Sequence, residues 1–313
     1  MTHSKLKLND DKTEALLIHS HRQSHVSFPN SITVGHSNIP FSSHARNLGF
    51  IISGDLSLNR HVSHICRSAY IAIRQVSAIR RYLTVEATKT LMCALVLSRL
   101  DYCNSLLSGC PKNLLNKLQL VQNAAARLVY KAKKRDHVTP LLHSLHWLPV
   151  QARIEYKLSV ICHNHFIDCS PPYISEILSV YTPSRCLRSS SDKRTFCIPK
   201  THTRSYGERS FAFSGPKQFN SLPPNIRDLP TTSSFKKALK THLFKKYFMW
   251  FLIITTVYGR CMTNCWCIGR MISCFECYVL VCMKHIFGWF IFGCVVFMLC
   301  KAHWALSDRG NCA

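Results

Sequence analysis

Histidine and cysteine are the residues in this sequence best suited to bind a metal or to act as nucleophiles, and there are 17 of each. A structural zinc site needs two closely spaced cysteine pairs, or one such pair with spaced histidines. Among the cysteines near the C-terminus only Cys274 and Cys277 form a Cys-x-x-Cys pair. His19, His21 and His25, and likewise His143 and His146, are expected to be surface or interface residues. The sequence also lacks His-Glu-x-x-His, Gly-x-Ser-x-Gly and phosphate-loop motifs, so we expect no metal site and no catalytic residue.

Basic residues indicate a function more strongly than the histidines and cysteines do. The chain has 40 Lys and Arg residues against 15 Asp and Glu residues, a formal net charge of +25. Such an excess is typical of proteins that bind polyanions, either nucleic acid or an anionic membrane surface. The sequence shows no comparable signal for a small-molecule substrate.

Four arginines recur at intervals of seven residues, at Arg60, Arg67, Arg74 and Arg81. Seven residues are close to two helical turns, so on a helix the four side chains form one stripe. Two interpretations stay open: a solvated helix face, or a face laid along a phosphate backbone. A second basic cluster comes later in the chain, at Lys133, Lys134 and Arg135.

The hydrophobic pattern divides the chain into four segments. Residues 1–59 read as short strands, including a hairpin around 32–41 and a strand over 48–52. Residues 60–135 show helical periodicity, with Thr84 as an N-cap and a helix running toward Leu106. Residues 136–247 combine a helix over 151–166, a loop-rich stretch and a last helix capped by Ser234. Residues 248–313 form an apolar tail with nine of the 17 cysteines.

The predicted fold class is therefore α+β and mostly α. We expect a small β-rich piece, then a basic helical bundle, then a loop-rich segment and the tail. With 47% hydrophobic and 18% charged residues, the chain as a whole is not disordered.

Several motifs resemble non-LTR, LINE-type retrotransposon reverse transcriptases. Lys5–Glu14 looks like the segment that comes after their catalytic strand, and Asn47–Ile52 resembles their primer grip. Asp101–Leu106 and Leu118–Arg127 are similar to the thumb of that family.

The resemblance continues beyond the thumb and covers about residues 1–247. His143–Val150, Arg153–Leu158, Tyr206–Phe211 and Asn220–Pro223 match the segment beyond the thumb in the family. One departure is that the usual tryptophan after Gly215-Pro216 is replaced by lysine.

The resemblance implies a fragment: the end of the palm, the thumb and the segment after it. A complete polymerase of this family uses Mg²⁺ held by aspartates. The only Asp-Asp pair here, Asp10-Asp11, comes after Lys-Leu-Asn rather than after an aromatic residue and alanine, so we interpret it as part of a turn. No cofactor is therefore expected for this chain alone. The nucleic-acid-binding residues implied are Lys12, Leu48, Gly49, Arg60, Arg67, Arg74, Arg81, Lys133, Lys134 and Arg135.

The C-terminal tail supplies an alternative. Residues 278–302 are long enough for a membrane-spanning helix, but Lys284 and His285 interrupt them and leave an uninterrupted apolar stretch of only 15 residues, 286–300. They predict either a membrane anchor or read-through sequence without a stable fold. The polar residues 1–14 contain no signal peptide, and the scattered cysteines of the body suit an intracellular protein, nuclear or cytoplasmic.

These observations leave three candidate functions. The first is a truncated reverse transcriptase that binds an RNA or DNA template–primer and does not polymerise alone. The second is a membrane-anchored basic interaction protein. The third is an active polymerase with an unrecognised carboxylate set.

Overall fold

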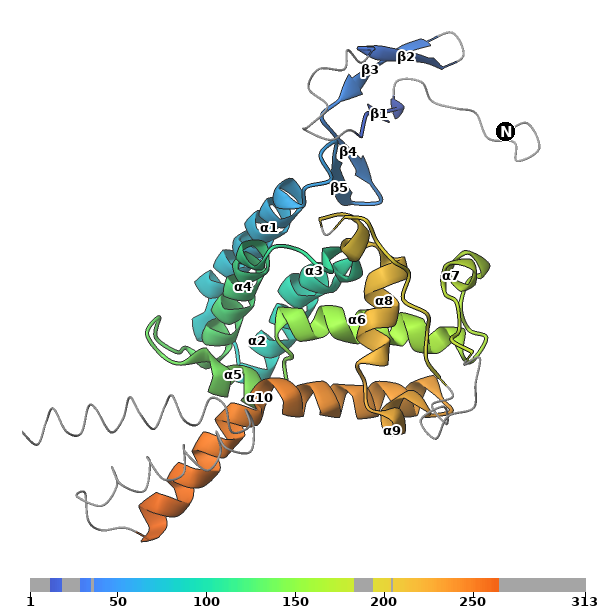
Figure 1. Ribbon diagram of the computed structural model, residues 1–313. Coiled ribbons are helices and arrows are strands. Elements are labelled where there is room, and N and C mark those ends of the chain that lie inside the picture. Colours follow the sequence, from blue (N-terminus) through green and yellow to red (C-terminus); the bar gives the residue numbers. More distant parts are fainter. Residues whose placement is uncertain (1–11, 19–28, 35–36, 183–193, 204, 265–313) are drawn as a thin grey trace, which may run out of the picture. The chain divides into compact units, whose positions relative to one another are not determined.

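The structure is a computed structural model that describes residues 12–18, 29–34, 37–182, 194–203 and 205–264, with side chains up to 249. Contacts divide the chain into two units, residues 1–249 and residues 250–313. The first unit holds a small N-terminal mixed β region, after which the chain is helical (Figure 1). The predicted α+β, mostly α class is therefore confirmed.

The β region consists of two small sheets. In the first, β3 pairs in parallel with β1 and antiparallel with β2, and Ile32 is opposite Ile39 as the predicted hairpin requires. In the second, β4 and β5 form an antiparallel hairpin. The strands are β1 (Ala15–Leu16), β2 (Ser31–Val34), β3 (Ser37–Ser42), β4 (His44–Asn47) and β5 (Phe50–Ser53).

Helical segments make up most of the rest of the described chain, and the last of them begins in the first unit and ends in the second. They are α1 (Asn59–Ile79), η4 (Arg80–Tyr82), α2 (Val85–Met92), η5 (Cys93–Leu97), α3 (Ser98–Asp101), η6 (Asn104–Leu107), α4 (Lys112–Tyr130), α5 (Val138–Ser144), α6 (Val150–His165), α7 (Pro172–Ile177), η7 (Gly207–Arg209), α8 (Phe211–Asn220), α9 (Pro224–Arg227) and α10 (Thr232–Asn264). η5 is a π-helical turn that joins α2 to α3 without a break.

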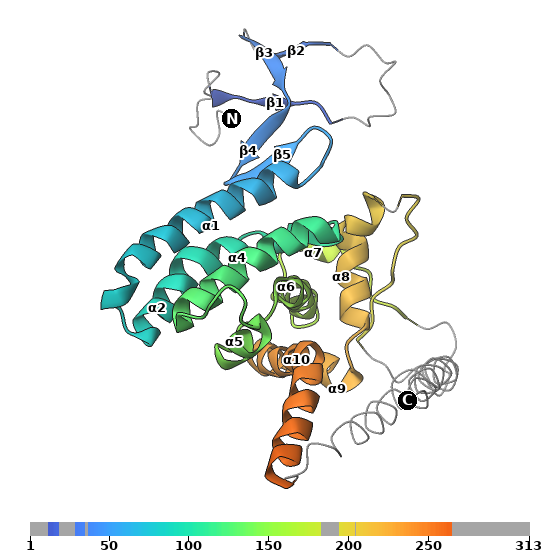
Figure 2. The ribbon, with the colours of Figure 1, turned by 90° about the vertical axis from the view of Figure 1, so that its left-hand side faces the viewer.

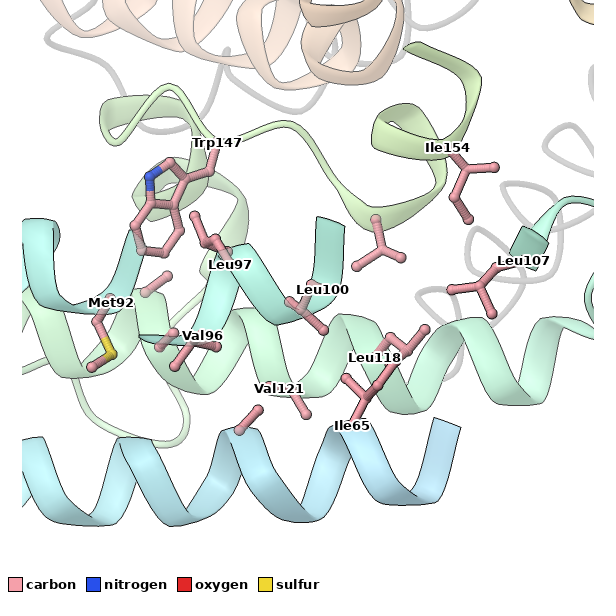
Figure 3. Packing of buried hydrophobic residues seen from close by; sticks show 14 of the residues in the cluster. Ile65, Met92, Val96, Leu97, Leu100, Leu107, Leu118, Val121, Trp147 and Ile154 are labelled. Carbon is pink, nitrogen blue, oxygen red and sulfur yellow. The ribbon is translucent and has the colours of Figure 1, made fainter. Parts of the chain in front are cut away.

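A first core forms where α1 and α4 pack side by side (Figure 2). The apolar stripe of α1 includes Val62 and Ala69, both fully buried, and it meets Leu118 and Val121 of α4. The α2–α3 segment contributes a second layer above this pair, and Trp147 covers that layer (Figure 3). Burial of these side chains is the main force that holds the bundle together.

A second core lies between α6, α8 and α10. Phe219 of α8 and Phe235 of α10 are completely buried in it, and the ring of His163 stacks on Phe235 at 4.0 Å. α8 lies in the stretch predicted to be mostly loop. Gly215 admits the close approach to α6, because an added Cβ would lie 3.0 Å from Cys162 Sγ. The sequence hides this helix because Gly and Pro are poor helix formers.

Two local predictions are corrected and one is confirmed. The helix expected to run toward Leu106 ends at Asp101, because Cys103 adopts a left-handed conformation with φ of 52°. The last helix begins at Thr232, three residues earlier than predicted, and Thr231 Oγ1, not Ser234, accepts the capping hydrogen bond. The Thr84 cap is confirmed, since its hydroxyl accepts from the Ala87 amide at 3.2 Å.

Candidate nucleic-acid interface

The arginine stripe lies on the solvent side of α1. Arg60, Arg67 and Arg74 are exposed there, and Arg81 lies in η4 rather than in α1. None of the four forms an ion pair with an acid within the described part of the chain. At 1.5 Å per residue the 21 residues of α1 extend about 30 Å. The stripe is therefore an extended line of unneutralised positive charge.

The turn between β4 and β5 lies beside the N-terminal half of α1. Leu48 and Gly49 form the turn rather than part of a strand, which corrects the prediction, and both have positive φ, 47° and 86°. Such a pair of central residues suits a tight hairpin turn. Leu48 exposes 86% of its surface. The hydroxyl of Tyr102 donates a hydrogen bond to the Leu48 carbonyl oxygen and so fastens the turn to the segment after α3.

A cleft of about 430 Å³ opens between this turn, α1 and α3. Its cationic side chains are Arg46 and Arg99, and His64 and the exposed ring of Tyr102 lie beside them. Arg99 Nη1 donates to the carbonyl and hydroxyl oxygens of Ser68 at 2.7 and 2.6 Å, which holds the guanidinium at the rim. The cleft has no acidic residue in its described lining.

His61 supports the cleft from beneath. Its ring lies 3.9 Å from that of Phe50, and its Nδ1 accepts a hydrogen bond from the Ile51 amide. Burial, and secondarily the charge of His64, lower the pKa of His61 to about 4. The side chain is therefore a neutral structural group at physiological pH and adds no charge to the interface.

Arg60 joins the hairpin to the stripe. Its Nη1 lies 3.0 Å from Nδ1 of His44, on β4. His44 pairs with Ser53 at the end of the hairpin opposite the turn, so Arg60 contacts the open end of the hairpin, whereas Leu48 and Gly49 lie beside His64 and Ser68 of α1.

Lys133, Lys134 and Arg135 lie at the opposite end of the bundle. α4 ends at Tyr130, so the cluster is in the loop after the helix and not in the helix itself. Asp136 Oδ2 accepts from the Lys133 amide at 2.6 Å and folds the loop back, while the three side chains stay exposed. Arg81 shares this end of the bundle, because the neighbouring Arg80 contacts the last turn of α4. Lys12 precedes β1, and no residue of that segment lines the cleft.

Arg80 is a basic residue that the periodic pattern did not single out. It is 6% exposed, and its guanidinium donates to the carbonyl oxygens of Leu83, Leu128 and Val129 at 2.7 to 2.9 Å. The last two carbonyls lie in the final turn of α4, where a cation is favoured by the helix dipole. Arg80 is therefore structural, whereas its neighbour Arg81 faces solvent.

Motifs that are far apart in the sequence meet in the fold. Buried Gln122 donates to the Leu148 carbonyl at 2.8 Å, and Gln119 accepts from the Val150 amide at 2.9 Å. Gln122 is fully buried, although polar residues of such a helix usually face solvent, because its side chain meets this carbonyl. Arg153 Nη1 donates to Asp101 Oδ2 at 2.6 Å. The segments that carry the family resemblance thus contact one another directly.

The predictions about metal binding and membrane insertion can be compared with the structure only within the described residues. These residues contain no group of three or more metal-binding side chains. The Asp10-Asp11 pair and residues 278–302 lie outside the described part. No helix within that part combines the length and apolar character needed to cross a bilayer.

Comparison with protein-family models, with curated proteins and with solved structures gave no match for this chain. The functional assignment therefore rests on the geometry of the interface and on the motifs that form it.

Proposed function

We propose that this chain is the thumb and post-thumb segment of a LINE-type reverse transcriptase and that it binds a template–primer duplex of RNA or DNA. The observation that carries the proposal is the cationic cleft at the β4–β5 turn, whose described lining has no acid, together with the exposed arginine stripe on the same helix, α1. A polymerase thumb performs this task by holding the duplex through its phosphates.

The dimensions and the chemistry of the stripe support duplex binding. About 30 Å of helix corresponds to roughly nine base pairs at 3.4 Å per step. Between Ala15 and Val85 every Lys or Arg position is an arginine, and the only acid is Asp55. Arginine forms bidentate hydrogen bonds with phosphate, so this composition suits backbone contacts better than general solvation.

The motif contacts give independent support. The primer-grip-like turn touches the thumb-like segment through Tyr102, and that segment is joined to the next motif through Asp101 and Arg153. Order along the chain and contact in space therefore agree with the resemblance. The proposal concerns binding, and it assigns no polymerase chemistry to the described residues.

The test is a salt titration of duplex binding by fluorescence anisotropy. Wild type should bind a template–primer duplex with an affinity that falls steeply between 50 and 200 mM salt, because bound phosphates release counterions. Replacing both Arg67 and Arg74 with Gln should weaken binding about tenfold or more and lower the slope of log K against log salt by about 2.

The matched control removes two exposed lysines elsewhere, Lys200→Gln with Lys236→Gln. It loses the same charge but should keep most of the affinity. Equal losses in the two double variants, or an affinity independent of salt in the wild type, would overturn the proposal.

A further inference from the structure

A second groove lies on the other side of α3 from the cleft. Two adjoining hollows, of about 350 and 430 Å³, share Asp101, His146, Arg153 and Lys240 and so form one depression between α3, α6 and α10. We call it the α3–α10 groove. Ser98 lines both this groove and the cleft at the β4–β5 turn, so the two hollows are neighbours.

The groove is strongly cationic. Lys89, Arg153, Lys157 and Lys240 line it, and Asp101 is the acid among its described lining residues. The Asp101–Arg153 pair, at 2.6 Å, offsets one charge and fixes the guanidinium, whose Nε also donates to the Leu148 carbonyl at 2.8 Å. The three lysines that remain unpaired with Asp101 give the groove a formal net charge of +3. An anion is therefore the expected occupant.

A buried acceptor narrows the chemistry of that anion. Asn104 lines the groove, is only 3% exposed, and its Oδ1 has no hydrogen-bond donor within the described chain. An unpaired buried acceptor is costly, so the occupant should supply an O–H or N–H group. A phosphodiester group has no O–H or N–H and does not meet this need by itself, whereas a nucleotide carries such donors on its ribose or base.

Two rings complete the lining. Tyr156 is half-buried, and His146 is exposed at a left-handed position with φ of 56°. His146 comes just after α5. Its backbone amide donates to the His143 carbonyl oxygen, and the Trp147 amide donates to the Leu142 carbonyl oxygen. Glycine is the usual residue at this position of a helix end, because a side chain there is strained. Aromatic side chains beside a cationic groove are the arrangement that binds unpaired bases.

We propose that the α3–α10 groove holds a single-stranded stretch of nucleic acid that continues from the duplex bound at the cleft and stripe. This inference rests on the proposed function. Ser98 lines both the cleft and the groove, so a strand that leaves a duplex bound at the cleft can enter the groove. Lys89, Lys157 and Lys240 bind its phosphates, and Asn104 accepts a hydrogen bond from a ribose or base.

The experiment compares a blunt duplex with the same duplex carrying an eight-nucleotide RNA overhang, using the full chain and fluorescence anisotropy. In the wild type the overhang should raise affinity about tenfold. Lys157→Gln with Lys240→Gln should abolish that gain and leave blunt-duplex binding within twofold of wild type. Both lysines are exposed, so the variant should keep the wild-type fold. Asn104→Leu should reduce the gain in part, and an unchanged gain would overturn the role of that acceptor.

The outcomes separate the two proposals. If the overhang adds nothing in the wild type, the groove proposal fails while duplex binding stands. If Arg67→Gln with Arg74→Gln leaves blunt-duplex binding unchanged but the overhang gain depends on Lys157 and Lys240, the duplex proposal fails instead. If ATP binds the wild type, fails to bind the lysine variant, and the overhang has no effect, the groove takes free nucleotides and the strand proposal is overturned.

Discussion

Two adjacent arginines show how burial assigns different roles to the same side chain. Arg80 stabilises the end of α4 through three carbonyl oxygens, and Arg81 belongs to the solvent-facing stripe. Desolvation of the Arg80 guanidinium is offset by these hydrogen bonds and by the negative end of α4.

Replacing each arginine with methionine tests this difference. Arg80→Met leaves buried carbonyls without a donor, so it should lower the free energy of unfolding by about 2–4 kcal/mol. Arg81→Met should change stability by less than about 0.5 kcal/mol and should weaken duplex binding. Urea unfolding and anisotropy measure the two effects. Equal stability of the two variants would contradict the role of Arg80.

His61 predicts a pH dependence of stability. Its pKa is about 4 in the folded chain, below the ordinary value of 6.5, because burial disfavours the charged ring. The unfolded chain therefore takes up a proton more readily, and the free energy of unfolding should fall as pH drops from about 6.5 toward 4. Above pH 6.5 the group contributes no pH dependence.

The measurement compares wild type with His61→Gln in urea at pH 7 and pH 4.5. The variant should lose less stability on acidification than wild type. His163 and His242 also have pKa values lowered by burial, and they give the background common to both proteins. Identical losses in the two proteins would show that His61 is not the titrating group.

At the scale of elements, the β4–β5 hairpin depends on a contact outside itself. Its strands pair over only four residues, from Asn47 opposite Phe50 to His44 opposite Ser53. A hairpin this short is marginal in water by itself. The Tyr102 hydrogen bond to the Leu48 carbonyl and the contact of Phe50 with His61 hold it against the helices.

Tyr102→Phe should loosen this hairpin selectively. Loss of one hydrogen bond costs about 1 kcal/mol, so local amide exchange over residues 47–50 should accelerate about fivefold. Exchange in the buried turns of α4, near Val121 and Val129, should stay at the wild-type rate. Hydrogen exchange measured by mass spectrometry distinguishes the two regions, and uniform acceleration would mean that the substitution destabilises the whole fold.

At the scale of the whole molecule, α10 closes the first unit. Phe235, Leu239 and Leu243 are completely buried and Phe248 is 1% exposed. Glu155 of α6 adds a polar attachment, accepting from Tyr247 at 2.6 Å and from Lys246 at 3.0 Å. The core therefore depends on residues up to 248.

Two truncations test this dependence. A chain ending at Met249 should show a cooperative unfolding transition with the stability of the full chain, because both cores are complete. A chain ending at Thr231 should fail to fold, because losing four buried side chains at about 2–5 kcal/mol each exceeds a typical domain stability. Circular dichroism melting curves measure both, and a folded chain without α10 would refute the assignment.

The amino-acid sequence by itself determined the features that depend on neighbouring residues. The amphipathic pattern of α1, the Thr84 cap and the first hairpin needed only local spacing, and the structure has all three. The same local logic placed Arg60, Arg67 and Arg74 on one exposed face. A helix or a turn brings such residues together whatever the rest of the chain does.

Only the tertiary structure decided the rest. The burial of Arg80 and Gln122, the helix around Gly215 and the groove beside Asn104 each require segments that are distant in the sequence. No periodic pattern reports such contacts, because a side chain carries the same letter whether it meets water or a carbonyl from another helix. Packing determines which polar groups lose their water, and that loss of water separates a structural arginine from one free to bind phosphate.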